Sequence, residues 1–598
     1  MPHQAPDDGH IPSGQVASTE GPHRVESKIS SRTAGQQDSR TAGQQDSRTA
    51  GQQDSRTVIV AVRSAGALHR LLDVLPVFDG DTRVTIRFTL LPGSHFDVGA
   101  LAALDHSGAR ILPWEEARRI RHDLVLSASP KGELHELSGR RALLPHGAGF
   151  NKTISNDGSP DVPSGLDPHY LLVDGVPWAD LHALAHEDQA ARLAQHCPSA
   201  VDRVAVVGDP TLDRLLASVP HRQDYRGHLA TGARQLIVLT STWGPESLLA
   251  RRPGLSADLI GVLPHDAFQV ALIVHPNEYS HTGSFDLSRQ LAPALAAGLV
   301  LTRPYEEWAS LLVAADAVVT DHGSTALYAA ALGRPVIGAY DGGRELLPGS
   351  PMAQLLDSVP RLSEASGLEH ALRDSRTVDT RGHAAGAFAQ QGRALPLLRQ
   401  RLYRMLGLRP PSGPLEAPAF SRPSTTPRQP SAFAVRAEVS GHRIALKRFP
   451  PHVQGAVHHL AAEYPTAGPR QIQSAAVLWR RARTAVSSAQ HTAWTAEGWT
   501  SHVLEEAPGC RTSAAVLSPR RCLLRHRTAG LFSVRLEPHR DGGMVSHADP
   551  TAVVSAVHAW LGANANRSLP VSLLCDTGPV AVRVRLCPAT ADDLGYEL

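Results

Sequence analysis

LVAADAVVTDHGSTALYAAALGRPVIGAY, residues 312–340, is the stretch that decides the fold. An apolar run (317–320) is followed by the turn residues Asp-His-Gly, a helix-forming segment (324–332) and a second apolar run (336–339). Short apolar runs bounded by turn residues are typical of strands in a parallel sheet. The stretch therefore predicts a β-α-β unit whose helix begins at the carboxyl edge of the sheet.

The start of this helix has the features of an anion site. Gly323 can adopt the backbone angles of a sharp turn, and Ser324 or Thr325 can cap the helix. The first N–H groups of a helix attract anions such as a phosphate or a diphosphate. An ordinary β-α-β unit in a protein core has the same local pattern, so both interpretations stay open at this point.

The composition of the chain sets broad limits. Its 598 residues carry a net charge of +2, which argues neither for nor against nucleic acid. The five cysteines form no C-x-x-C pair, so neither a zinc site nor a disulfide framework is indicated. No apolar run approaches the roughly 20 residues of a membrane helix. The first residues lack the pattern of a secretory signal. We therefore expect a soluble cytoplasmic protein.

Patterning divides the chain into five parts. An eight-residue repeat, SRTAGQQD, fills a polar N-terminal segment that cannot bury an apolar face and is expected to be disordered. Alternating strand and helix patterns follow in two blocks, which favours two doubly wound parallel sheets. A Pro/Ser-rich linker precedes a third domain, expected to be α+β and of unknown role. The predicted boundaries are 1–56, 57–233, 234–408, 409–430 and 431–598.

Two segments are interpreted as helices within these blocks. The first is 179–195, between two strands of the first domain. The second is 471–489, which carries several arginines of the third domain. A nucleic-acid surface on that domain is a less favoured interpretation than a solvated basic face.

Histidines recur where predicted strands end. His146 lies in PHGAGFNK after a strand of the first domain, and His275 lies in HPNEY after a strand of the second. Residues 321–325 follow a third strand. Ligands of doubly wound sheets bind at the carboxyl ends of strands, so a cleft between the two domains would bring these positions together.

These motifs resemble those of the CDP-glycerol glycerophosphotransferase family of teichoic-acid synthesis, which has the glycosyltransferase B fold. His146-Gly147 matches the family's His-Gly loop, and Gly208-x-Pro-x-x-Asp213 matches its turn near the domain junction. The hydroxyl-rich strand end 240–243, the His275-Pro276 pair and the 320–325 segment match in the same order. The resemblance covers about 140–345.

The resemblance implies a transferase that moves a glycerol-phosphate or glycosyl group from a nucleotide-diphosphate donor to a hydroxyl acceptor, in cell-wall or polysaccharide synthesis. We expect His146 to be the catalytic base. The donor phosphates are assigned to His275, Asp321, Gly323, Ser324 and Thr325, and the donor nucleoside to Thr242, Tyr305 and Glu306. No cofactor and no metal are expected. A polyol-phosphate or lipid-linked acceptor would imply peripheral association with the inner face of the membrane.

Departures from the family pattern keep other functions open. His322-Gly323 replaces the family's Tyr-Ser, and the first-domain loop keeps Lys152 but lacks the family's Trp and Pro. A UDP-N-acetylglucosamine 2-epimerase-like enzyme would share the architecture and a similar helix start. A catalytically inactive nucleotide-binding scaffold would account for the repeats, the linker and the third domain.

Overall fold

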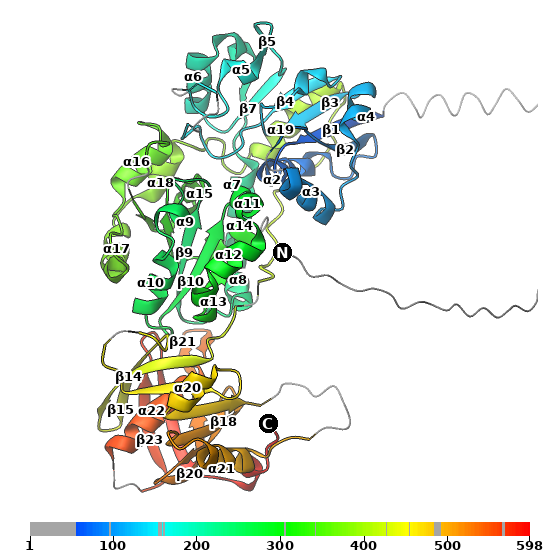
Figure 1. The fold of residues 1–598 in the computed structure, drawn as a ribbon. Helices are drawn as coiled ribbons and strands as arrows, with labels where there is room; N and C mark the ends of the chain where they lie inside the picture. The colour runs from blue at the N-terminus through cyan, green and yellow to red at the C-terminus, as the bar shows by residue number, and fades with distance from the viewer. Residues whose placement is uncertain are drawn as a thin grey trace, which may run out of the picture. The chain divides into compact units, whose positions relative to one another are not determined.

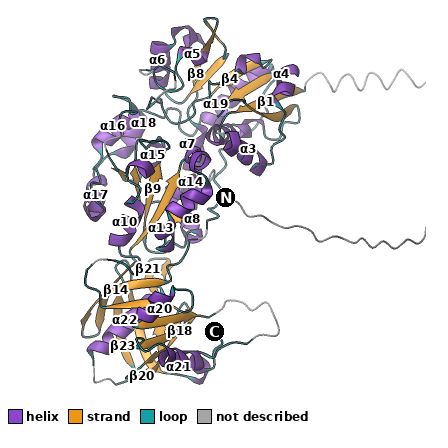
Figure 2. Cartoon of the chain, viewed as in Figure 1, coloured by secondary structure: helices purple, strands orange, loops and turns teal. Residues whose placement is uncertain are grey.

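The structure is a computed structural model that describes residues 55–94, 97–153, 158–159, 162–303, 307–340, 343–425, 427–453, 455–482, 492–564 and 568–598. Of the segment 1–56 predicted to be disordered, residues 1–54 lie outside these ranges, whereas Arg56 already belongs to the first strand, Arg56–Val62. From Ser55 to the C-terminus the chain forms one compact unit. Its strands fall into two parallel sheets and a closed barrel, with two small hairpins (Figure 2).

The first sheet has six parallel strands and organises what we call the first lobe. Its order is β2-β1-β3-β4-β7-β8, so the direction of strand addition reverses between β1 and β3. Strands β1 and β3, on either side of this reversal, are mostly apolar because helices cover both of their faces. The bounds are β1 (Arg56–Val62), β2 (Val84–Leu90), β3 (Leu124–Ser127), β4 (Arg140–Leu143), β7 (Leu181–Leu184) and β8 (Val204–Val206).

The second sheet has five parallel strands and organises the second lobe. Its order is β11-β10-β9-β12-β13, and the reversal falls between β9 and β12. Helices lie on both sides of β9 and β10 (Figure 1). The bounds are β9 (Gln235–Ser241), β10 (Phe268–Val274), β11 (Val300–Leu301), β12 (Ala317–Thr320) and β13 (Val336–Gly338). The predicted β-α-β unit of residues 317–339 is present as β12, α15 (Thr325–Ala331) and β13.

The helices of the two lobes are mostly short. Helix α19 follows the second lobe in sequence, yet its buried leucines pack into the core of the first sheet, so the chain returns to the first lobe. None of the helices in the described ranges is long and apolar enough to cross a bilayer. The bounds of the lobe helices are α2 (Ala65–Leu72), α3 (Asp97–His106), α4 (Trp114–Arg119), α5 (Pro168–Leu171), α6 (Glu187–His196), α7 (Pro210–Ser218), α8 (Arg222–His228), α9 (Leu248–Arg251), α10 (Leu255–Val262), α11 (Pro276–Thr282), α12 (Ser284–Gln290), α13 (Ala292–Ala296), α14 (Glu307–Ala314), α16 (Pro351–Ser358), α17 (Leu368–Ser375), α18 (Thr380–Ala385) and α19 (Ala394–Leu406).

The third domain, expected to be α+β, contains a closed barrel of nine strands. Helix α22 (Pro550–Ala563) packs against five of these strands, is buried on nearly all sides and belongs to the apolar core of the barrel. The barrel order is β14 (Ala432–Ser440), β15 (Arg443–Phe449), β23 (Val571–Asp576), β24 (Ala581–Pro588), β20 (Gly530–Leu536), β19 (Arg521–His526), β18 (Thr512–Ser518), β17 (Val477–Arg481) and β16 (His459–Glu463). Shorter helices are α20 (Pro469–Ser474), α21 (Ala496–Glu506) and α23 (Ala591–Leu594).

Both helix predictions singled out above were wrong in part. Within 179–195, strand β7 occupies Leu181–Leu184, and the helix begins only at Glu187. All four β7 residues are buried in the sheet, and that environment overrides their helix propensity. Within 471–489, the helix ends at Ser474 and strand β17 follows, because its Val-Leu-Trp core is buried between two parallel neighbours. Residues 483–489 lie outside the described part.

The Pro/Ser-rich segment predicted as a linker packs on both lobes. The ring of Phe420 lies under the guanidinium of Arg214, 3.9 Å from its carbon. The backbone N–H of Phe420 donates to Ser218 Oγ of α7, 2.8 Å away. The N–H of Ser424 donates to Glu307 Oε1 of α14, also at 2.8 Å. Side chains of the two lobes therefore fix the backbone of this segment at Phe420 and Ser424.

Candidate functional site

A cavity of about 1150 Å³ opens at the carboxyl edges of the two parallel sheets, lined by residues of both lobes. Ligand pockets of enzymes are typically some 300–1,000 Å³, so this one has room for a nucleotide and a second substrate. The reversal points of both sheets open onto it. Thr242 follows β9 and Asp321 follows β12, the two strands between which the order of the second sheet reverses. This is where ligands of open parallel sheets bind.

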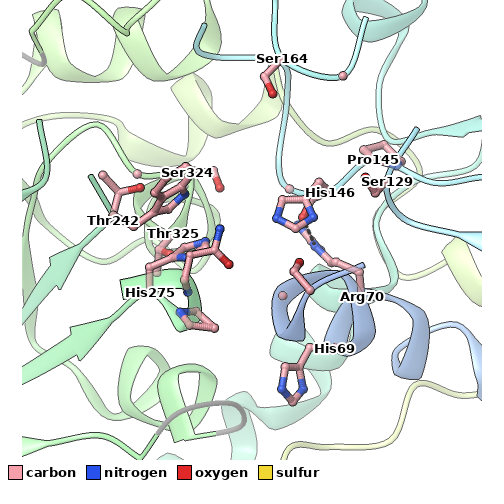
Figure 3. A pocket seen from close by; sticks show the side chains of 18 of the residues that line it. His69, Arg70, Ser129, Pro145, His146, Ser164, Thr242, His275, Ser324 and Thr325 are labelled. Carbon is pink, nitrogen blue, oxygen red and sulfur yellow. Dashed lines mark hydrogen bonds between the residues drawn. The ribbon is translucent and has the colours of Figure 1, made fainter. Parts of the chain in front are cut away.

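His146 lies at the first-lobe wall of the cavity and is exposed to it (Figure 3). One ring nitrogen bonds the carbonyl of Ala128, which fixes the tautomer and leaves the other nitrogen to accept a proton. The enclosing walls, and after them the cation of Arg70, lower the pKa of His146 to about 4. The imidazole is therefore neutral at pH 7.

The predicted phosphate side faces His146 across the cavity. Figure 3 shows His275, Ser324 and Thr325 on one wall and His146 with Arg70 on the other. The walls approach closely here, since a Cβ atom added at Gly147 would lie 3.1 Å from Ser324 Oγ. Glycine at 147 lets the two lobes come this near. His146 and the start of α15 thus share one crevice.

Asp321 organises the second-lobe loops. Its carboxylate accepts N–H bonds from Thr242, Leu248 and Gly323, each at 2.8 Å, and so ties together the loops that follow β9 and β12. Because Gly323 donates its N–H to Asp321, the donors left at this helix start are the N–H groups and hydroxyls of Ser324 and Thr325. Ser324 occupies the N-cap position, but its hydroxyl caps no helix N–H. The predicted hydroxyl cap is therefore absent, and that hydroxyl remains available to a ligand.

His275 combines a structural role with a donor directed at the cavity. Its Nδ1 accepts the N–H of Asn277, 3.1 Å away, and caps helix α11. A neutral imidazole that accepts at Nδ1 carries its proton on Nε2. Burial lowers the pKa of His275 well below its usual value, with further contributions from His146 and Lys152, so the ring stays neutral. Nε2–H is therefore a fixed donor at the cavity wall.

Arg70 is a site residue that the sequence analysis missed. From helix α2 it donates to the carbonyl of His146 at 3.2 Å and to Asp209 at 3.2 Å, and it also bonds the hydroxyl of Tyr328 on α15. Tyr328 in turn donates to Asp209 at 2.8 Å. This network fixes the His146 loop relative to both lobes. No local motif marks Arg70, because its partners come from three distant segments.

The loop after β4 crosses to the second lobe. Lys152 and Leu346 form an antiparallel bridge, and the N–H of Thr153 donates to the carbonyl of Glu345 at 2.9 Å. Glu345 Oε2 lies 3.5 Å from Lys152 Nζ and 3.1 Å from His322 Nε2. His322 is buried and bonded in this way, so its ring serves the loop rather than the cavity centre.

The remaining predicted residues are placed as follows. Thr242 is buried beside Gly323 and lines the cavity, while its hydroxyl lies 3.5 Å from Lys152 Nζ. Tyr305 and Glu306, assigned to the donor nucleoside, lie outside the described residues. The Gly208-x-Pro-x-x-Asp213 turn shapes the junction. Asp213 accepts the N–H groups of Gly392 and Ala394 at 2.6 and 2.7 Å, which fixes the start of α19.

The cavity lining is basic. Six cationic side chains and three carboxylates line it, together with six histidines. The cations are Arg63, Arg70, Lys131, Lys152, Arg214 and Arg303, and the carboxylates are Asp73, Glu278 and Asp321. A cleft walled mainly by one sign of charge attracts ligands of the other sign. The lining therefore suits an anionic ligand.

Comparison with known proteins gives a likeness of structure and no match of sequence. No family model matches the chain, and no curated protein matches it. A solved structure of the wall teichoic acid polymerase TagF is 15% identical, covers 59% of this chain and 89% of its own, and gives a TM-score of 0.44. The chain is thus similar in structure to a wall teichoic acid polymerase, an enzyme of the kind that its motifs resemble.

Two further solved structures are similar to this chain. The S. aureus MnaA–UDP co-structure is 10% identical and covers 61% of this chain and 100% of its own, with a TM-score of 0.41. The UDP-GlcNAc 2-epimerase from Neisseria meningitidis bound to UDP-GlcNAc is 13% identical and covers 58% and 100%, with a TM-score of 0.37. At these identities and TM-scores the likeness identifies neither a substrate nor an activity.

Proposed function

We propose that this chain is a transferase that moves a glycerol-phosphate or glycosyl group from a nucleotide-diphosphate donor of the CDP-glycerol type to a hydroxyl acceptor. The observation that carries the proposal is the pairing of a neutral imidazole, His146, with an anion-binding wall at Ser324 and Thr325 across one basic cavity. Attack by a hydroxyl on a diphosphate-linked group requires a proton acceptor and a site for the leaving phosphate, and the two walls supply one each.

The donor diphosphate is proposed to lie on the second-lobe wall. Ser324 and Thr325, with their N–H groups and hydroxyls, and His275, with its Nε2–H, line the same wall of the cavity (Figure 3). Asp321 is assigned a positioning role because its carboxylate is occupied by three backbone N–H groups and would repel a phosphate. Thr242 lies beside this wall, near the donor.

In the proposed reaction His146 accepts the proton of the acceptor hydroxyl as its oxygen attacks. For glycerol-phosphate transfer the oxygen bonds to the phosphorus next to the glycerol, the bridging P–O bond breaks, and a nucleoside monophosphate leaves. A pKa of about 4 makes His146 a weak base in the free protein. A bound diphosphate brings negative charge near it and stabilises the imidazolium, so donor binding should raise this pKa towards neutrality.

A panel of donors tests the proposal. The full chain is incubated with CDP-glycerol, UDP-N-acetylglucosamine and GDP-mannose, with and without a polyol-phosphate acceptor, and the products are separated by mass. Transfer predicts free nucleotide that appears in step with a lengthened acceptor. An epimerised sugar-nucleotide would support the epimerase-like alternative instead. A thermal shift with a donor but no turnover would instead support an inactive nucleotide-binding scaffold. Absence of both turnover and any thermal shift with all three donors would contradict the proposal.

A further inference from the structure

Three histidines gather at the barrel, away from the cavity. His459 begins strand β16 and His458 immediately precedes it, while His558 lies on helix α22, which packs against the barrel strands. One ring nitrogen from each lies within 4.8 Å of the other two. The rings of His459 and His558 have centroids 4.6 Å apart. His558 is distant in sequence from the pair, so no spacing motif in the sequence reveals the cluster.

The hydrogen bonds of the cluster leave a buried nitrogen unpaired. His459 is 6% exposed, and its Nε2 has no hydrogen-bond partner. Its Nδ1 lies 2.9 Å from Nδ1 of His458, and one of these two rings must donate a proton to the other. Whichever ring donates, Nε2 of His459 stays buried without a partner. An unsatisfied buried polar group is costly, and in native proteins it calls for a ligand or a specific role.

We propose that His458, His459 and His558 form a binding site for a divalent transition-metal ion of the Zn²⁺ class. Neutral imidazole is a preferred ligand of Zn²⁺, Co²⁺ and Ni²⁺. A cation at the cluster would replace the Nδ1···Nδ1 contact between His458 and His459, so that each ring gives one lone pair to the metal and keeps its proton on its other nitrogen. The exposure of His458 provides an entry path and room for a water or an anion as a further ligand.

The surroundings of His558 suit this role. Its Nδ1 lies 2.8 Å from the hydroxyl oxygen of the buried Thr512 on β18. With the proton on Nδ1 and donated to Thr512, the Nε2 lone pair of His558 is free for a metal. A partner on the second ring nitrogen is a regular feature of metal-binding histidines. Thr512 is thus assigned as a positioning residue for the site.

The test uses the full chain, stripped with EDTA and dialysed, and titrated with Zn²⁺ by calorimetry and with Co²⁺ by visible absorption. One ion per chain is expected, with a rise in melting temperature. His458→Ala removes the exposed ligand with little risk to folding, and we expect it to weaken Zn²⁺ binding at least tenfold. Thr512→Val, similar in shape, should weaken it by about tenfold.

His442→Ala is the matched control, since His442 is an exposed histidine of the same barrel and lies outside the cluster. It should leave both titrations unchanged. The proposal is overturned if the wild-type chain binds no Zn²⁺, or if stoichiometric binding persists unweakened in His458→Ala, or if His442→Ala lowers it equally. None of these readouts depends on transferase activity.

Discussion

At the scale of single residues, chemically similar side chains of the cavity have different roles because their hydrogen-bond partners differ. His146 and His275 are both neutral at pH 7, but their partners differ: His146 keeps one nitrogen for a proton, whereas His275 uses Nδ1 as a cap and presents Nε2–H. Asp321 is buried, and burial raises its pKa, while three N–H donors oppose that shift. Their hydrogen bonds therefore give the three residues different roles: His146 can accept a proton, His275 donates a hydrogen bond, and Asp321 holds the loops together.

The pH dependence of transfer should follow the pKa of His146. Because the pKa of His146 is lowered to about 4, the neutral base is present down to that pH, and kcat/KM should fall only as the pH drops through about 4. An ordinary histidine would produce this fall near 6.5. The acid limb of kcat should lie at higher pH, since bound diphosphate stabilises the imidazolium. Stopped assays from about pH 3 to 8 check both limbs, and a kcat/KM limb at 6.5 would exclude the assigned environment.

At the scale of elements, strand exits position the site and one carboxylate secures the lobe junction. The junction turn holds α7 against the start of α19 through Asp213. Burial raises the pKa of Asp213 to about 6, although the two N–H groups that donate to its carboxylate lower the pKa in part. The carboxylate is thus largely ionised at pH 7 and accepts the N–H groups of Gly392 and Ala394.

Replacing Asp213 tests this junction. Asp213→Ala leaves the N–H groups of Gly392 and Ala394 unpaired, and we expect the free energy of unfolding to fall by about 1–3 kcal/mol. Asp224→Ala is the control, since Asp224 makes an exposed pair with Arg422 and should cost less than about 1 kcal/mol. Urea denaturation of both variants measures the difference. Equal losses would mean that Asp213 does not fix α19.

Local sequence patterns predicted the elements that are defined locally. The 317–339 unit was predicted because its apolar runs and turn residues are contiguous, and the residues at strand exits were predicted because parallel strands end at one edge. Leu181–Leu184 was misread because a short apolar segment does not distinguish a strand from a helix. Arg70 and the barrel were missed because each depends on partners distant in sequence.

At the scale of the whole molecule, a buried ion network joins the barrel to the second lobe. Arg448 of β15 is 1% exposed and contacts Asp266 of the second lobe at 2.5 Å and Asp549 of the barrel at 3.0 Å. The N–H of His265 also donates to the carbonyl of Arg448 at 2.8 Å. This contact fixes the barrel through one side chain whose charge is fully paired.

Removing that charge should be costly. Arg448→Met keeps the volume but leaves two carboxylates without their partner, and we expect a loss of about 3–5 kcal/mol in the free energy of unfolding. Arg443 lies on the same strand as Arg448 and makes an exposed pair with Asp576 of β23. Arg443→Met breaks this pair and should cost no more than about 1 kcal/mol. Denaturation midpoints of the two variants make the comparison. Similar midpoints would show that the network adds nothing to stability.

The measurement that tests the central claim most directly is transfer and donor binding in His146→Ala. If His146 takes the acceptor's proton while the opposite wall holds the diphosphate, kcat should fall by at least about 10²-fold. The Kd for CDP-glycerol, measured by calorimetry, should change by no more than about twofold, because the base contributes little to donor binding. Full turnover in this variant, or loss of donor binding together with activity, would contradict the account.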